Sequence, residues 1–171
     1  ITPPTSEAAH SAKREFLHSM ADSAVALHTE EANDQHYELP QSFFSQILGE
    51  HRKYSCCYYP TGHETLNQAE ERMLSLYGER AGLADNQDIL ELGCGWGSLT
   101  LWMAERYPQA SVTAVSNSHG QRHYIEARCR EKKLDNVKVV TCDANRFDAA
   151  AASFARVVSI EMFDHLRNWR Q

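Results

Sequence analysis

Short apolar runs alternate with amphipathic stretches between residues 88 and 160. Short apolar runs are typical of strands covered on both faces, whereas apolar residues that recur roughly every three to four positions are typical of helices. Strands that alternate with helices indicate an α/β fold with a parallel sheet and right-handed crossovers. The expected strands are 88–92, 111–115, 137–141 and 156–160, and the expected helices between them are 98–107 and 121–132.

The first part of the chain has the periodicity of helices. Thr5 or Ser6 can cap the first of them. The last expected helix, 64–80, ends before Gly82, a residue type that commonly follows a helix. Glu70 is expected on the polar face of this helix. This helix is expected to cover the sheet and to carry no chemistry. The three expected helices are 7–27, 41–48 and 64–80.

A glycine-rich turn, Gly93-Cys94-Gly95-Trp96-Gly97, follows the first expected strand. Alternate glycines let the backbone turn tightly and let a ligand approach main-chain N–H groups, as in nucleotide-type sites. A dinucleotide fingerprint fits imperfectly, because Ser98 stands where its third small residue belongs. A plain strand-to-helix turn is the alternative. Ligands of parallel sheets bind beyond the carboxyl ends of the strands.

Two domains are expected. Residues 1–62 form a helical arm, interrupted at 33–40, which serves either as a lid over the glycine turn or as packing support; both readings stay open. Residues 63–171 form the ligand-binding domain.

Composition narrows the classes of function. The net charge of −6 argues against a nucleic-acid partner, because nucleic-acid binders usually carry a basic face. Neither a long apolar span nor a signal peptide is present in the sequence, so a cytoplasmic protein without stable membrane insertion is expected. The five cysteines include no C-x-x-C pair and the nine histidines are scattered, so no metal site is expected.

Four ordered segments share their residues with one known family. They are Lys53-Tyr54-Ser55-Cys56-Cys57-Tyr58, Leu92-Gly93-Cys94-Gly95-Trp96-Gly97, Asn117-Ser118 with Gln121, and Ser159-Ile160-Glu161-Met162-Phe163-Asp164-His165. Together they resemble the S-adenosylmethionine-dependent enzymes of the cyclopropane-fatty-acid synthase and coclaurine N-methyltransferase group. The resemblance implies a Rossmann-like class I methyltransferase fold, a three-layer α/β/α sandwich.

That resemblance also assigns residues to the methionine end of S-adenosylmethionine. It implies that Tyr54 and Ser55 close over this end of the cofactor. Gly93 and Gly95 would face it through the backbone, and Ile160 would pack near the sulfonium.

Four further residues are assigned to the nucleoside by the same resemblance. Asn117 would bind the ribose hydroxyls, and Gln121 would reach the ribose or the adenine. Asp143 would accept a hydrogen bond from the adenine amino group, and Ala144 would offer a main-chain N–H. The alternatives are a turn-forming Asn117 and a helix-capping Asp143.

The choice of reaction within the family depends on residues 161–165. If this stretch begins a helix, Glu161 and His165 share a face at the mouth of the site. Cyclopropane synthases, which hold bicarbonate as a base, typically have Gly and Glu where this chain has Glu161 and Asp164, whereas the N-methyltransferase branch has Glu at the first position. Glu161 would bind the acceptor amine or take its proton, and His165 suits general-base catalysis at neutral pH. A solvated helix start is the alternative.

The sequence therefore predicts methyl transfer to a small-molecule amine. Methyl transfer to lipid acyl chains, an inactive cofactor-binding module and a NAD-linked oxidoreductase are alternatives in that order, and a homodimer is allowed for. The methyltransferase fold normally continues through three more strands in the order 3-2-1-4-5-7-6. The chain is thus expected to be the N-terminal part of a longer protein, with its fourth strand left as an exposed edge.

Overall fold

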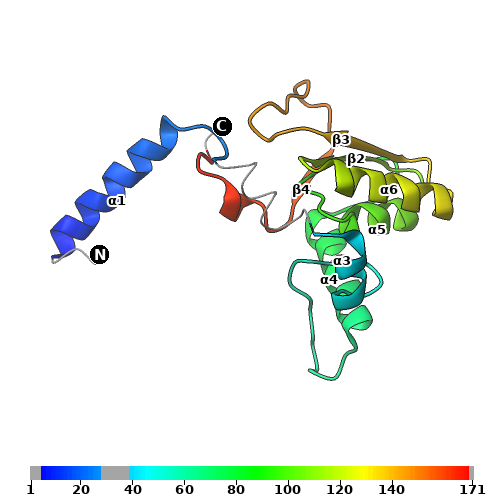
Figure 1. Cartoon of the computed structure of the whole chain (residues 1–171). Coiled ribbons are helices and arrows are strands. Elements are labelled where there is room, and N and C mark those ends of the chain that lie inside the picture. Colours follow the sequence, from blue (N-terminus) through cyan, green and yellow to red (C-terminus); the bar gives the residue numbers. More distant parts are fainter. Residues whose placement is uncertain (1–4, 28–38, 170–171) are drawn as a thin grey trace.

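A four-stranded parallel sheet in the order β3-β2-β1-β4 forms the centre of the molecule (Figure 1). The computed structural model describes residues 5–27 and 39–169. All four strands begin and end within one residue of their predicted positions, and β4 is an edge strand, as predicted. The strands are β1 (Asp88–Leu92), β2 (Ser111–Ser116), β3 (Val137–Thr141) and β4 (Arg156–Ser159).

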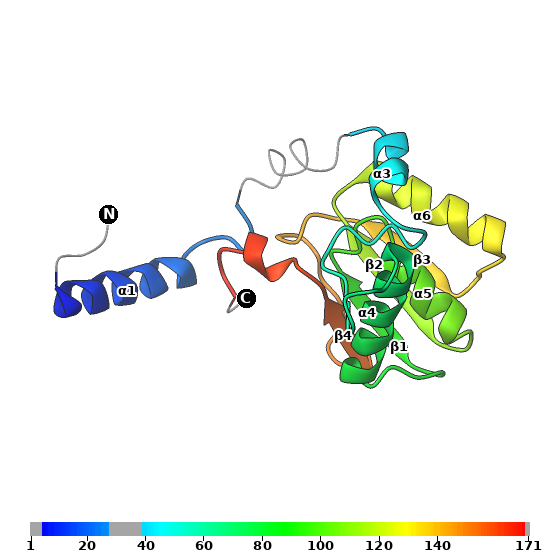
Figure 2. The same ribbon diagram turned by 90° about the horizontal axis from the view of Figure 1, so that it is seen from below.

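Three helices cover one face of this sheet, with α5 between α4 and α6 (Figures 1 and 2). Ile89 of β1 lies beside Val112 of β2, and both are fully buried in one core cluster with Leu74 of α4 and Met103 of α5. On the opposite face Val157 of β4 is 59% exposed. The part of the chain that the structure describes thus supplies one helical layer of the predicted three-layer fold. The helices are α4 (Leu66–Ala81), α5 (Ser98–Arg106) and α6 (His119–Lys132).

Local sequence signals set the ends of these helices. Thr65 and Gln68 form a capping box at the start of α4, which therefore begins two residues after the predicted position 64. Gly82 ends the helix in a left-handed conformation with φ 59°, as predicted. Gly97, with φ 77°, precedes α5, and a Cβ there would lie 2.6 Å from Ile125 of α6. This glycine therefore allows the turn and α6 to approach closely.

The two N-terminal helices differ in how they contact this body. Helix α1 (Ser6–Ala21) has no buried residue and stands apart from the sheet in both views (Figures 1 and 2). Helix α3 (Gln41–Ile47) packs on the body through Phe44, which is fully buried. The predicted break at 33–40 lies largely outside the described residues.

The prediction that the first helix extends to Leu27 is wrong, because the segment after Ala21 pairs with the C-terminal part of the chain. Ala26 forms an antiparallel bridge with Leu166, and Val25 O accepts a hydrogen bond from Arg167 N at 2.7 Å. The side chain of Asn145 bonds both the N–H and the carbonyl of Ala26. These contacts use backbone groups that a continuing helix would need for itself.

Across residues 5–27 and 39–169, no helix combines the length and the apolar character that a membrane crossing requires. The same residues include no group of three or more His, Cys, Asp or Glu side chains placed to hold a metal ion.

Candidate active site

A cavity of about 310 Å³ lies beside the glycine turn, where β1 and β4 end. Its walls come from residues 52–55, helix α4, the glycine turn with the start of α5, and the stretch 160–165. Cavities of this size with a few polar groups accommodate small molecules. The predicted site residues that line it are Tyr54, Ser55, Gly93, Gly95, Ile160, Glu161, Asp164 and His165.

The two glycines predicted to face a ligand have different surroundings. A Cβ at Gly93 would lie 2.8 Å from the sulfur of Met162, so the lack of a side chain at Gly93 lets the residues after β4 pack against the turn. A Cβ at Gly95, whose φ is 52°, would meet no atom within 4 Å. Because Gly95 also lines the cavity, its bare backbone is the part of the turn that a ligand can approach.

Glu91 of β1 is a buried carboxylate at the cavity wall. Thr100 Oγ1 donates a hydrogen bond of 2.5 Å to its Oε2. Burial raises the pKa of Glu91 to about 7, against the smaller opposing effect of this hydrogen bond. Glu91 was not among the predicted site residues, although it stands only two residues before Gly93, near the end of the strand that leads into the glycine turn.

Three buried side-chain polar atoms of cavity-lining residues have no hydrogen-bond partner within the described chain. They are Nη1 of Arg52, the hydroxyl of Ser98 and the indole N–H of Trp96. Buried polar groups are normally satisfied, so these atoms point to a polar ligand or water at this site.

An aromatic row supports the wall at residues 52–55. The ring of Phe44 lies 5.5 Å from that of Tyr54 and 4.9 Å from that of Trp96, which lies 5.6 Å from Tyr124. The guanidinium of Arg52 lies 4.4 Å from the Tyr124 ring centroid. Helix α3 therefore packs directly behind a predicted cofactor-covering residue.

Glu70 of α4 fixes the backbone that leads to this wall. Its carboxylate accepts hydrogen bonds from Gly49 N at 3.0 Å, His51 N at 2.9 Å and Lys53 N at 3.2 Å. A Cβ at Gly49 would lie 2.5 Å from Glu70 Oε2, so the close approach requires glycine. The prediction that Glu70 lies on a polar face is wrong, because Glu70 is fully buried. Helix α4 covers the sheet as predicted, and its Tyr77 also lines the cavity.

Glu161 follows β4 and reaches across the cavity mouth. Its Oε1 accepts a hydrogen bond of 3.0 Å from Cys56 N, which joins residues far apart in sequence. Its φ of 50° is uncommon for a residue with a side chain, and such strained positions cluster at functional sites.

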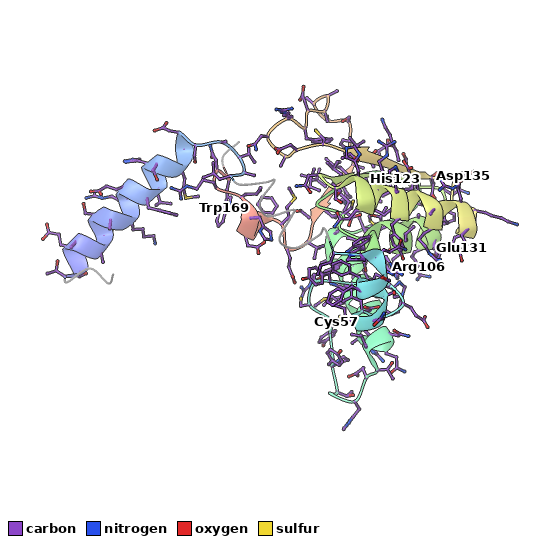
Figure 3. All side chains as sticks on the ribbon, viewed as in Figure 1. Cys57, Arg106, His123, Glu131, Asp135 and Trp169 are labelled. Atoms are coloured by element: carbon purple, nitrogen blue, oxygen red, sulfur yellow. The ribbon has the colours of Figure 1, made fainter. Side chains whose placement is uncertain are left out.

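The expected helix at 161–165 does not form. A single 3₁₀ turn, η1 (Phe163–His165), begins after Glu161, so Glu161 and His165 do not share a helical face. They meet instead as linings of the same cavity. His165 Nε2 lies 3.8 Å from Asp164 Oδ2. The indole of Trp169 (Figure 3) donates to Phe163 O and closes the turn.

The predicted nucleoside residues lie at the same sheet edge but do not line the cavity. Asn117 and Asp143 follow the paired strands β2 and β3. Asp143 caps a turn by accepting from Asn145 N at 2.7 Å. Gln121 is buried on Ser116, and its Nε2 has no partner in the described chain. Ala144, next to Asp143, is half-buried.

Fold and cavity together define a class of protein. A parallel sheet ordered β3-β2-β1-β4, a glycine turn after β1 and a cavity at the carboxyl ends are the features of a Rossmann-like class I methyltransferase fold. The model of the mycolic acid cyclopropane synthetase family matches residues 26–171, so the chain belongs to this family. This match confirms the resemblance predicted from the four motifs.

Relatives in both branches of the resemblance are similar to the chain. The (S)-coclaurine N-methyltransferase of Thalictrum flavum subsp. glaucum is 39% identical over 154 residues, which are 90% of this chain and 42% of the relative. The cyclopropane-fatty-acyl-phospholipid synthase of Escherichia coli K12 is 33% identical over 132 residues, which are 77% of this chain and 32% of the relative.

A solved structure of coclaurine N-methyltransferase bound to N-methylheliamine and S-adenosylhomocysteine (SAH) superposes with a TM-score of 0.89 at 39% identity. The match covers 98% of this chain and 48% of that one. The chain therefore spans between about a third and about half of the length of these relatives.

Proposed function

We propose that the protein transfers a methyl group from S-adenosylmethionine (SAM) to the nitrogen of a small-molecule amine. The observation that carries this proposal is the Glu161 carboxylate at the cavity mouth, with His165 in the same lining. The (S)-coclaurine N-methyltransferase similarity supports the choice of an amine over a lipid chain.

The residues around the cavity fit the methionine end of SAM. The exposed backbone of Gly95 and the unpartnered Ser98 hydroxyl offer a surface and a hydrogen bond to it. Glu91 is placed to accept from its amino group, since burial keeps this carboxylate away from solvent. Tyr54 and Ser55 close over this end of the molecule, with Gly93 and Ile160 in the wall.

For the nucleoside we propose Asn117, Gln121, Asp143 and Ala144 at the adjacent sheet edge. The buried Nε2 of Gln121 supports this assignment, because it lacks a partner in the described chain. A ribose hydroxyl would accept its hydrogen bond.

SAM supplies a methyl group that its sulfonium already activates, so the protein has to align the acceptor and remove its proton. Cys56 N–H holds one oxygen of Glu161, which leaves the other oxygen to accept a hydrogen bond from the amine. His165, whose Nε2 lies 3.8 Å from Asp164 Oδ2, takes the proton as general base.

We also propose that residues 1–62 act as an arm, of which α3 and the wall at 52–55 cover the cofactor. The packing of Phe44 against Tyr54 supports this division. All five cysteines are free, which is consistent with a reducing compartment such as the cytoplasm.

Methyl transfer to lipid acyl chains is the second candidate, because the E. coli relative is a cyclopropane-fatty-acyl-phospholipid synthase. Asp164 could bind bicarbonate with a shorter reach than glutamate. The acidic composition offers little attraction to anionic headgroups, which disfavours this reaction.

The test supplies methyl-labelled SAM to the intact protein with a panel of secondary and tertiary amines and, separately, with phospholipid vesicles. We expect label in the amine fraction. Label in the vesicles alone would select the lipid reaction. Binding of SAM without transfer to either acceptor would indicate a cofactor-binding module.

A further inference from the structure

Lys53 is a buried lysine that no predicted role explains. Only 3% of its surface is exposed, although lysines are rarely buried unless they are paired. In the described chain no carboxylate lies within ion-pair distance of its Nζ. Burial lowers the pKa of Lys53, and the nearby Cys56 and Cys57 thiols and the carboxylates of Glu161 and Glu70 oppose this effect.

Two hydroxyl groups hold this ammonium at the cavity wall. Lys53 Nζ donates to Ser55 Oγ at 2.5 Å and to Tyr77 Oη at 3.2 Å, and it lies 4.8 Å from the Tyr77 ring centroid. The backbone of Lys53 is fixed by Glu70. Lys53, Ser55 and Tyr77 all line the cavity, so the positive charge is fixed beside the space for a ligand.

The direction of the Lys53–Ser55 hydrogen bond determines what Ser55 can offer. Because an ammonium only donates, the Ser55 oxygen is the acceptor, and its own hydrogen can go either to Tyr77 Oη, with which Ser55 also interacts, or to an acceptor on a ligand in the cavity. A carboxylate is the acceptor that benefits most, since it also gains from the nearby positive charge.

We infer that Lys53 is a positioning residue that orients the Ser55 hydroxyl toward the carboxylate of the methionine tail of SAM. Glu91, in the same cavity, lies ready for the amino group of that tail. The site then offers opposite charges to the two ends of an α-amino acid. This inference rests on the proposed use of SAM and extends it to recognition of the amino-acid tail.

Calorimetric titrations of the intact protein with SAH and with 5′-methylthioadenosine test the inference, because only SAH carries the amino-acid tail. Lys53→Met keeps most of the side-chain length and removes the charge. We expect it to weaken SAH binding about tenfold to hundredfold, the usual range for a charge-assisted hydrogen bond. Binding of methylthioadenosine should stay within about twofold. Lys138→Met, at an exposed position on β3, is the matched control and should change neither affinity.

Two further variants, Ser55→Ala and the double variant Lys53→Met/Ser55→Ala, show whether Lys53 acts by positioning Ser55 or through its charge alone. If Lys53 acts through Ser55, the loss of SAH affinity in the double variant is smaller than the combined losses of the single variants. Ser55→Ala removes only a hydroxyl, so it tests the same contact even if Lys53→Met fails to fold. The inference would be overturned if Lys53→Met weakened the binding of SAH and of methylthioadenosine equally. It would also be overturned if the losses of SAH affinity were additive in the double variant, or if Ser55→Ala left the SAH affinity unchanged. Failure of the wild type to bind SAH would instead overturn the proposed function, and this inference with it.

Discussion

Two buried carboxylates flank the cavity, and their surroundings satisfy them very differently. Glu70 of α4 accepts hydrogen bonds from three backbone N–H groups. Glu91 of β1 accepts one side-chain hydrogen bond within the described chain, from Thr100, and its pKa is raised to about 7. A well-satisfied carboxylate stabilises the loop that binds it, whereas a poorly satisfied one is costly to keep charged.

The two carboxylates therefore have different roles at the cavity. The Glu70 side of the cavity is an anchored loop, whose backbone places Lys53 and the residues after it. The Glu91 side carries the open backbone of Gly95 and the unpartnered hydroxyl of Ser98. Glu70 therefore stabilises the loop that carries the cavity wall at residues 52–55, whereas Glu91 is assigned to contact with the ligand itself.

Replacement of Glu70 should have the largest effect on stability. Glu70→Ala leaves three backbone donors without their acceptor, so we expect the free energy of unfolding to fall by about 3 to 5 kcal/mol. Urea unfolding of the intact protein measures this, with Glu79→Ala on an exposed position of the same helix as control. A loss below about 1 kcal/mol would show that Glu70 does not anchor the loop.

Replacement of Glu91 should instead raise the free energy of unfolding at high pH. The pKa of Glu91 is raised from an ordinary 4.5 to about 7, so the folded state favours the protonated form. The stabilisation from the protonated form is complete below pH 4.5 and is lost as the pH rises through 7. Glu91→Gln removes this dependence, so at pH 8 the variant should be more stable by about 3 kcal/mol.

Measuring unfolding free energies from pH 4.5 to pH 8 checks the sign. Wild type should lose stability across this interval relative to Glu91→Gln, and SAH should bind more weakly to the variant. Parallel pH profiles for the two proteins would contradict the account.

Replacement of Gly95 should have a smaller effect on stability and a specific effect on ligand binding. Gly95→Ala places a methyl group in the cavity, and we expect SAH affinity to fall about tenfold. Gly62→Ala is the matched control, because Gly62 also has a positive φ and open space around it but does not line the cavity. Both variants should lose similar stability, about 1 kcal/mol, from their backbone conformation. Equal SAH affinities would remove Gly95 from the ligand site.

The smallest change in the free energy of unfolding is expected for a substitution at Glu71, the neighbour of Glu70. Its half-exposed carboxylate accepts from Trp102 Nε1 at 2.9 Å and lies 3.1 Å from His51 Nε2. Glu71→Gln keeps an acceptor for the indole and alters only a solvent-exposed carboxylate–imidazole contact, so a change of about 0.5 kcal/mol is expected. A change as large as that of Glu70→Ala would show that burial does not separate the two positions.

Periodicity and glycine placement predicted the sheet and α3 to α6 closely, because these elements are fixed by local signals such as the Thr65 capping box and Gly82. The extension of α1 to Leu27 failed because the backbone near Ala26 pairs with Leu166, a contact that no local pattern encodes.

The candidate site was predictable where motif residues meet at the glycine turn. The placement of Glu70 was missed because three backbone groups from another segment make a buried carboxylate acceptable on an otherwise apolar face. The helical relation of Glu161 and His165 was wrong, because Glu161 takes a left-handed conformation. Lys53 is the first residue of one of the four family motifs, but its role was not predicted, because the burial of its side chain depends on Tyr77 of α4.

The most direct measurement compares the turnover of wild type and Glu161→Gln with labelled SAM and an accepted amine, alongside SAH affinity. Because Glu161 holds the amine through a hydrogen bond, the account predicts that kcat falls by about tenfold to hundredfold, the usual range for a lost hydrogen bond to a charged group, while SAH affinity changes by less than about twofold. An unchanged kcat, or a loss explained entirely by weaker SAH binding, would contradict the claim that this carboxylate acts on the acceptor.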